Sequence, residues 1–200
     1  AASSGHSWSR SYEPHRNLIS AVENRFGSTI ISRFDYANDE IARRTAISRS
    51  GTAFDTPVRD AYGYNARSEV TSARRTLSSD TNQEVRGFSY DYAYDPIGNR
   101  TFATEYDHED NALVSAYTAN ALNQYERRTV PGYASVRGTA TNTATVTVNG
   151  NAVWRLGEYF YGGDAADNAA SAVMKKLDIT AVVNPPGTND ADLVQSVTGR

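Results

Sequence analysis

Apolar and aromatic positions alternate with polar ones along most of the chain, and helical periodicity is scarce. The alternation predicts strands over five segments: residues 28–36, 59–64, 69–77, 84–94 and 100–106. It is clearest within residues 84–94, where Tyr90, Tyr92 and Tyr94 occupy every second position. Because successive strand residues point to opposite faces, this pattern indicates half-buried sheet. The sequence therefore predicts an all-β fold.

Turn residues join two of these strands into a hairpin. The run Asp95-Pro96-Ile97-Gly98-Asn99 lies between residues 84–94 and 100–106. Proline fixes φ, and Gly or Asn tolerates a positive φ, so this run predicts a tight turn. Two earlier segments stay open: residues 12–22 fit a short turn or a strand, and residues 40–47 fit a helix or a strand.

Internal repetition is the most informative feature of the chain. Each repeat has an aromatic residue, any residue, an aromatic or small residue, then Asp, Asn or Ala, a turn and a return strand. Four segments share the pattern: residues 34–41, 62–70, 92–100 and 117–125. From the third residue of one segment to the third residue of the next, the spacings are 28 (64 − 36), 30 (94 − 64) and 25 (119 − 94) residues. A period in this range indicates stacked supersecondary units, here antiparallel β-hairpins laid side by side to bury a common face.

Composition suggests how neighbouring hairpins would hold together. The chain contains 13 Tyr, and of its 20 basic residues only Lys175 and Lys176 are not arginine. Arginine binds carboxylates with two hydrogen bonds and stacks on aromatic faces, so we expect ladders of Tyr, Asp and Arg across the sheet. The residues expected to carry this structural role are Tyr36, Tyr64, Tyr92, Tyr94, Asp95, Gly98, Asn99, Arg100 and Tyr125.

Residues 92–100 and 120–128 resemble the YD repeats of Rhs-type proteins, which teneurins and the large insecticidal toxin-complex subunits share. The resemblance covers about residues 28–129, and the hairpin domain is expected to span residues 1–129. It implies a curved array of antiparallel hairpins that forms the wall of a hollow β-shell. Such a shell encloses a toxic or effector domain or presents it for delivery.

The resemblance also implies partners and a location. The partners would be further repeats and a C-terminal effector domain of the same, longer chain, and the protein would be secreted or exposed at a bacterial cell surface. The first residue is not Met, and the only Met is Met174, so we expect a segment of a longer or processed product.

Residues 130–200 do not continue the repeat. Val130-Pro131-Gly132 interrupts the pattern, and the alternating residues 144–148 run into Asn149-Gly150, a strong hairpin-turn signal. Residues 151–161 predict the returning strand and residues 162–164 a loop, while residues 176–183 predict a strand closed by a turn at 184–187. Five short strands at this spacing predict a small sandwich-like β module, which resembles the Ig-like insertions of some Rhs proteins.

Little in the chain points to catalysis. There is no Cys, which excludes disulfides, thiolate zinc sites and a Cys nucleophile. The three His lack metal-ligand spacing, and no Gly-x-Ser-x-Gly motif is present. The acidic loop at residues 106–111 fits either a calcium site or a solvated hairpin tip, and its residue order favours the tip. We therefore expect no enzyme activity, no cofactor and no metal.

Charge and hydropathy limit the possible partners. A net charge of −3 gives no electrostatic reason to bind nucleic acid, and no apolar run reaches the about 18 residues of a membrane span. The leading hypothesis is a non-catalytic structural role. The alternative is an extracellular binding or adhesion module that recognises a glycan or a cell-surface protein, through the tyrosine-rich sheet face or through residues 130–200. The same tyrosines would otherwise pack between neighbouring hairpins.

Overall fold

The computed structural model describes residues 5–168, 170–184 and 192–199, and these ranges contain strands, turns and no helix. The predicted all-β fold is confirmed, and every strand pair is antiparallel. The chain forms two compact units, the first ending at Val85 and the second beginning at Arg86.

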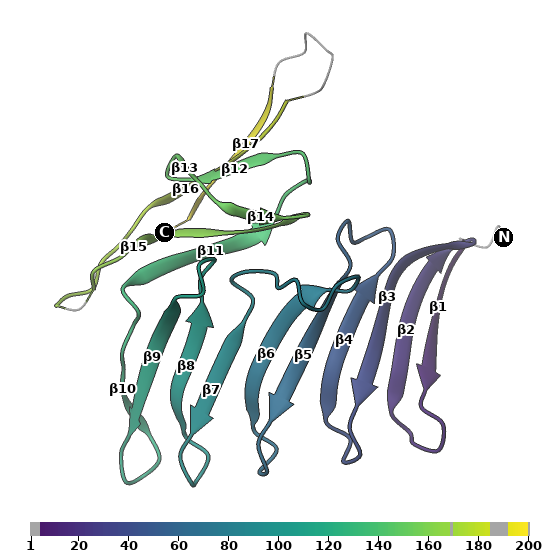
Figure 1. The fold of residues 1–200 in the computed structure, drawn as a ribbon, viewed down its shortest axis with the longest axis horizontal. Coiled ribbons are helices and arrows are strands. Elements are labelled where there is room, and N and C mark those ends of the chain that lie inside the picture. Colours follow the sequence, from purple (N-terminus) through teal and green to yellow (C-terminus); the bar gives the residue numbers. More distant parts are fainter. Residues whose placement is uncertain (1–4, 169, 185–191, 200) are drawn as a thin grey trace. The chain divides into compact units, whose positions relative to one another are not determined.

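The first unit is a meander in which each strand pairs with the next along the chain (Figure 1). Its six strands are β1 (His6–Tyr12), β2 (Ile19–Phe26), β3 (Thr29–Asn38), β4 (Arg44–Ser50), β5 (Val58–Tyr64) and β6 (Val70–Leu77). The segments left open by the sequence are resolved here: a turn separates β1 from β2, and residues 40–47 contain a turn followed by the start of β4.

The second unit opens with a meander of the same kind. Its four strands are β7 (Tyr90–Tyr94), β8 (Arg100–Tyr106), β9 (Ala112–Ala119) and β10 (Tyr125–Arg128). The hairpin predicted around residues 95–99 is the β7–β8 pair. The array of antiparallel hairpins predicted from the sequence is therefore present in both units.

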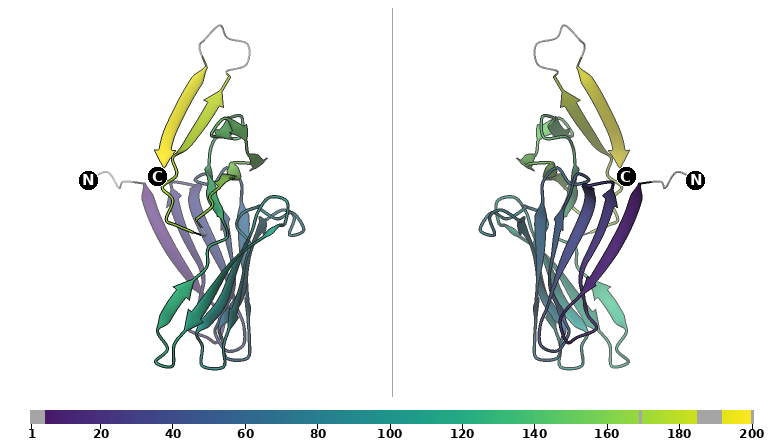
Figure 2. Two further views of the ribbon diagram at one scale, coloured as in Figure 1. Left: turned by 90° about the vertical axis from the view of Figure 1, so that its left-hand side faces the viewer. Right: turned by 90° about the vertical axis from the view of Figure 1, so that its right-hand side faces the viewer.

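Seven further strands of the second unit form two small sheets, ordered β11-β15-β14 and β13-β12-β16-β17. They are β11 (Tyr133–Thr139), β12 (Thr145–Val148), β13 (Asn151–Ala152), β14 (Trp154–Leu156), β15 (Tyr159–Ala165), β16 (Leu177–Val183) and β17 (Leu193–Gly199). The two sheets bury a common apolar core around Ala144, Val146 and Phe160. Figure 2 shows β16 and β17 side by side, as their register requires.

The predicted hairpin turn of this module is confirmed. Asn149 and Gly150 have φ of 50° and 79°, and Val148 pairs directly with Asn151. Two consecutive positive φ values match the turn that suits the twist of a two-residue hairpin. The predicted turn at residues 184–187 lies, apart from Asn184, outside the described residues.

Several predicted boundaries in the module are wrong. Residues 151–161 contain two short strands and the start of β15, and the predicted loop at 162–164 also belongs to β15, so the described residues of the module contain seven strands instead of five. Gly162 and Gly163 suggested a loop, but both allow close packing within the sheet. A Cβ at Gly162 would lie 2.4 Å from Val153, and one at Gly163 would lie 2.3 Å from the carbonyl oxygen of Ala134.

The strand predicted over residues 84–94 is also too long, because β7 begins at Tyr90. Gly87 has a φ of 77°, which a strand residue does not adopt. Its Cα lies so close to Tyr161 that an added Cβ would be 1.8 Å from the ring. This contact and the backbone conformation interrupt the alternating pattern.

Four hairpins share one turn geometry. In each, the first turn residue accepts backbone N–H groups from the second and fourth residues after it, through Oδ1 and over 2.8–3.1 Å. The third residue after it has a positive φ. The first turn residues are Asp39, Asn65, Asp95 and Asn120.

The same hairpins share one β-bulge. The residue just before the first turn residue pairs with the fifth residue after that first turn residue. The residue two before it pairs with the seventh, so the sixth is left out of the pairing and is bulged. The bulged residues are Thr45, Thr71, Thr101 and Glu126. Identical turns followed by identical bulges make the hairpin a structural repeat.

The structure corrects the alignment of the first repeat by two residues. The sequence pattern placed Ala37 where the turn begins, but the turn begins at Asp39. Only Asp39 carries a side-chain oxygen that can accept the two N–H groups, which is the physical reason for the shift. In this alignment, a tyrosine lies three residues before the first residue of each of the four turns: Tyr36, Tyr62, Tyr92 and Tyr117.

Candidate functional site

Hairpin turns of the first unit are bonded to one another. Arg16, in the turn between β1 and β2, donates from Nη1 to the carbonyl oxygen of Asp39 over 2.5 Å. Arg43, at the end of the turn between β3 and β4, donates from Nη1 to the carbonyl oxygen of Asn65 over 3.1 Å. Both acceptors are the first residues of repeat turns. The turns that join β1 to β2, β3 to β4 and β5 to β6 lie at the same end of the sheet in Figure 1 and therefore form a bonded row.

Tyrosine hydroxyls add bonds between neighbouring hairpins. The Tyr64 hydroxyl donates to the carbonyl oxygen of Arg44 over 2.7 Å. In the second unit, the Tyr125 hydroxyl accepts the backbone N–H of Arg100 over 2.7 Å. Arg44 opens β4 and Arg100 opens β8, so each tyrosine reaches the first strand residue after the preceding turn.

Arginine side chains cover several tyrosine rings. The guanidinium carbon of Arg44 lies 4.0 Å from the centre of the Tyr36 ring, and that of Arg100 lies 4.7 Å from the centre of Tyr92. Both distances are within the range of a cation–π contact. The expected meeting of return-strand arginines with tyrosine rings is therefore confirmed at these two positions.

Buried carboxylates link adjacent strands of the first unit. Asp60 on β5 is 7% exposed; it binds Arg75 on β6, with Nε 2.7 Å from Oδ1, and it also binds Arg49 on β4. Glu23 on β2 is 8% exposed and pairs with Arg33 on β3 over 2.9 Å. These pairs supply the Asp and Arg part of the expected ladders.

The β7–β8 turn contains the remaining predicted structural residues. Asn99 donates from Nδ2 to Asp95 Oδ2 over 2.9 Å, and Gly98 supplies the positive φ, here 95°. Tyr94 pairs with Arg100 across the hairpin. A recess of about 340 Å³ beside the turn is lined by Tyr94, Gly98, Arg100, Tyr117 and Tyr125.

Hydrogen bonding stabilises the charged form of the turn aspartates. Burial by itself raises the pKa of Asp95, but the side-chain and backbone donors of Asn99 outweigh it and hold that pKa below its ordinary value. Asp39 behaves in the same way, with Arg43 as the principal donor and charge partner. The native turns therefore favour ionised carboxylates.

The acidic loop at residues 106–111 is a hairpin tip of the same design. Asp107 Oδ1 accepts the backbone N–H groups of Glu109 and Asn111 over 2.8 and 2.9 Å, and Asp110 is paired with Arg86. In the described ranges, no group of three or more His, Cys, Asp or Glu side chains is placed to hold a metal ion.

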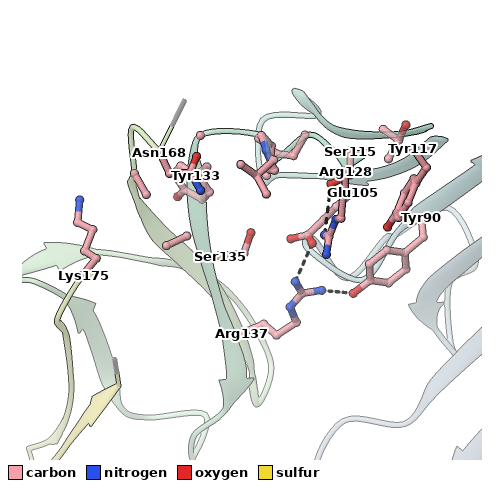
Figure 3. Close-up of a pocket in the computed structure, with 18 of the residues that line it drawn as sticks. Tyr90, Glu105, Ser115, Tyr117, Arg128, Tyr133, Ser135, Arg137, Asn168 and Lys175 are labelled. Carbon is pink, nitrogen blue, oxygen red and sulfur yellow. Dashed lines mark hydrogen bonds and ion pairs between the residues drawn. The ribbon is translucent and has the colours of Figure 1, made fainter. Parts of the chain in front are cut away.

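A cavity of about 680 Å³ lies on the sheet face of the second unit (Figure 3). Tyr90, Tyr92 and Tyr117 line it from the hairpin strands, and Tyr133 and Ser135 line it from β11. Its lining combines aromatic rings with hydroxyl groups. The charged residues that line it are Arg100, Glu105, Arg128, Arg137 and Lys175.

One wall of the cavity is fixed by a polar cluster. Arg137 on β11 donates to Glu105 on β8 over 2.7 Å and also donates to the Tyr90 hydroxyl, as Figure 3 shows. Glu105 faces the hydroxyl of the fully buried Tyr161 over 3.4 Å, and that hydroxyl lies 3.2 Å from Ser135. Burial raises the pKa of Tyr161, so its hydroxyl stays protonated and can donate.

The sequence indicated only part of this cavity. Tyr92 and Arg100 were among the predicted residues, and both line it. Tyr117 was not among the predicted residues, although the repeat pattern already placed it three residues before Asn120, as Tyr92 is before Asp95. Tyr133 and Arg137 lie outside the repeat, and no local pattern marks them.

Comparisons with known proteins add no family assignment, since no protein-family model and no curated protein matches the chain. The described residues contain no helix long and apolar enough to cross a membrane.

Proposed function

We propose that this chain is a non-catalytic structural segment of a β-shell wall, within a longer protein that encloses or presents a toxin or effector domain. The observation that carries the proposal is the hairpin repeat itself. The same turn and the same bulge recur four times, and bonds connect neighbouring turns within each unit. A unit built in this way can be extended by further copies, since each repeated hairpin contacts mainly its neighbours.

The edge of the first unit supports the same proposal. Strand β1 is the last strand of its sheet, and all seven of its residues are exposed. An open edge of this length can pair with further strands. In a shell wall, the neighbouring hairpins of the longer chain would cover it. The resemblance to YD repeats supplies the rest of the proposal, including secretion or display at a bacterial cell surface.

The mass of the native gene product tests the wall. Immunoblots of the source cells and their medium, made with an antibody to this chain, should show a band several times larger than 21.8 kDa. Limited proteolysis of that product should leave an enclosed domain intact until mild denaturant opens the shell. A secreted product near 21.8 kDa, or a domain cleaved equally fast with and without denaturant, would contradict the proposal.

The alternative function is a binding or adhesion module for a glycan or a cell-surface protein. The tyrosine-lined cavity of the second unit favours it, because aromatic rings and hydroxyl groups are suited to sugar recognition. A screen against glycans and surface proteins, with a Tyr133→Ala control, tests this alternative. Binding that the control retains in full would count against a role for this cavity.

A further inference from the structure

The lining of the cavity in the second unit carries an excess of positive charge, opposite in sign to the net charge of the chain. Four of the five charged residues that line it are basic, whereas the whole chain has a net charge of −3. Two of the four are already neutralised, since Arg137 binds Glu105 over 2.7 Å and Lys175 binds Asp164 over 2.8 Å. The excess positive charge therefore resides on Arg100 and Arg128.

Arg100 and Arg128 meet at the same aromatic ring. Their guanidinium carbons lie 5.9 and 5.6 Å from the centre of Tyr117. Among the residues that the structure describes, neither forms an ion pair with a carboxylate, and Arg128 donates to the neutral hydroxyl of Ser115 over 3.3 Å. Two guanidinium groups converging on one ring present planar donors that match a carboxylate, which can accept two hydrogen bonds from each.

The remaining lining fits a sugar ring. Tyr133 supplies an aromatic ring to the lining, and Ser135 and Asn168 offer polar groups around the same opening (Figure 3). The volume of about 680 Å³ is within the range of small-ligand sites. The aromatic rings, hydroxyls and guanidinium groups of this lining come from side chains, and such a combination suits a saccharide.

We propose that this cavity binds an acidic saccharide, with a uronic-acid carboxylate on Arg100 and Arg128 and a sugar ring against Tyr133. The inference rests on the binding-module alternative and is independent of the shell wall. It specifies the class of ligand that the alternative leaves open.

Calorimetric titration of the 200-residue chain with trigalacturonic acid tests the proposal, and the fully methyl-esterified trisaccharide is the matched ligand. The ester retains the rings and hydroxyls but carries no charge. The acid should bind with a dissociation constant of about 1 mM or lower. The dissociation constant of the ester should be at least about tenfold higher, since each charge-assisted hydrogen bond is lost. Equal binding of both would overturn the carboxylate assignment but keep the sugar site. Binding of neither would overturn both.

Arg128→Gln and Arg127→Gln form a matched pair of variants. Both residues are exposed on β10 and both changes remove one positive charge, but only Arg128 lines the cavity. Arg128→Gln should weaken binding of the acid about tenfold, and Arg127→Gln less than about twofold. Equal weakening would show general charge attraction and overturn the site. Arg100→Gln is the further variant, and its unfolding curve checks that the hairpin remains folded.

Discussion

Arg137 Nη2 lies 2.7 Å from Glu105 Oε2, and this ion pair joins β11 to β8 within the second unit. Glu105 is 32 residues before Arg137 and belongs to the hairpin array, whereas Arg137 belongs to the β module. The pair is part of a cluster with the buried Tyr161, and 29% and 21% of the Arg137 and Glu105 side chains are exposed. It thus links the two kinds of sheet where both line the cavity.

Removing this link should destabilise the second unit. Arg137→Met leaves Glu105 a half-buried carboxylate without its cation, and we expect a loss of about 1–3 kcal/mol in the free energy of unfolding. Urea unfolding followed by tryptophan fluorescence measures this loss. Because Trp8 is 62% exposed, the change in fluorescence should report mainly on Trp154, which belongs to the second unit. Arg67→Met is the control, because the Arg67 side chain is 46% exposed against 29% for Arg137, and it should cost at most about 1 kcal/mol.

The same cluster predicts how the β module behaves as a fragment. Residues 130–200 alone would lack Gly87 and Glu105, both of which contact Tyr161. The fragment 86–200 should therefore unfold at a higher urea concentration than the fragment 130–200. Equal midpoints would show that residues 130–200 fold independently of the hairpin strands.

Gly87 allows a third prediction with a close control. Gly87→Ala places a Cβ 1.8 Å from the Tyr161 ring at a φ of 77°, so steric overlap adds to backbone strain and the cost should reach about 3 kcal/mol or more. Gly150 has a φ of 79° and nothing within 4 Å of an added Cβ, so Gly150→Ala should cost only about 1–2 kcal/mol. If Tyr161 is the cause, Gly87→Ala should cost no more than Gly150→Ala in a Tyr161→Ala background.

These contacts mark the limit of what the sequence could predict. The alternating pattern and the turn chemistry of Asp95 depend on neighbouring residues, and the hairpins that they predicted are present. The choice between Ala37 and Asp39 required knowing which residue could accept the N–H groups of the turn. Gly162 and Gly163 have the composition of a loop, and only the packing of Val153 and Tyr133 shows why a strand needs them there.

The cavity follows the same division. Tyr92 and Arg100 were predicted because they recur within a repeat, so local order was enough. Tyr133 and Arg137 line the cavity only because β11 packs beside the hairpin strands of the same unit, and that arrangement depends on residues 32 to 50 positions apart. No pattern within a short window contains that information.

The tyrosine bond between hairpins gives a prediction for the first unit. Tyr64→Phe removes the donor to the Arg44 carbonyl oxygen while keeping the ring, and it should lower the free energy of unfolding by about 0.5–1.5 kcal/mol. Tyr12→Phe makes the same chemical change at a residue that is 48% exposed, and it should stay within about 0.5 kcal/mol of the unchanged chain. Equal effects in urea unfolding would show that the hydroxyl of Tyr64 does not support the row of hairpins.

The turn aspartates predict acid sensitivity that an asparagine substitution should reduce. The pKa values of Asp39 and Asp95 are lowered in the native state, so the unfolded chain binds protons at a higher pH, near the ordinary aspartate pKa of about 4. Their stabilisation is therefore complete at neutral pH and is lost as the pH falls through about 4 towards the native pKa values. Asn65 and Asn120 accept the same backbone bonds without a charge, which shows that the turn tolerates asparagine.

The double variant Asp39→Asn and Asp95→Asn should therefore fold with the same turns and lose less stability between about pH 7 and about pH 3.5 than the unchanged chain. Urea midpoints at the two pH values measure the difference. Asp55→Asn is the control for loss of charge, since it makes the same change at an exposed residue that caps no repeat turn. If the double variant also followed the unchanged chain, the acid sensitivity would have to arise elsewhere, with Glu23 and its arginine partners as the next group to test.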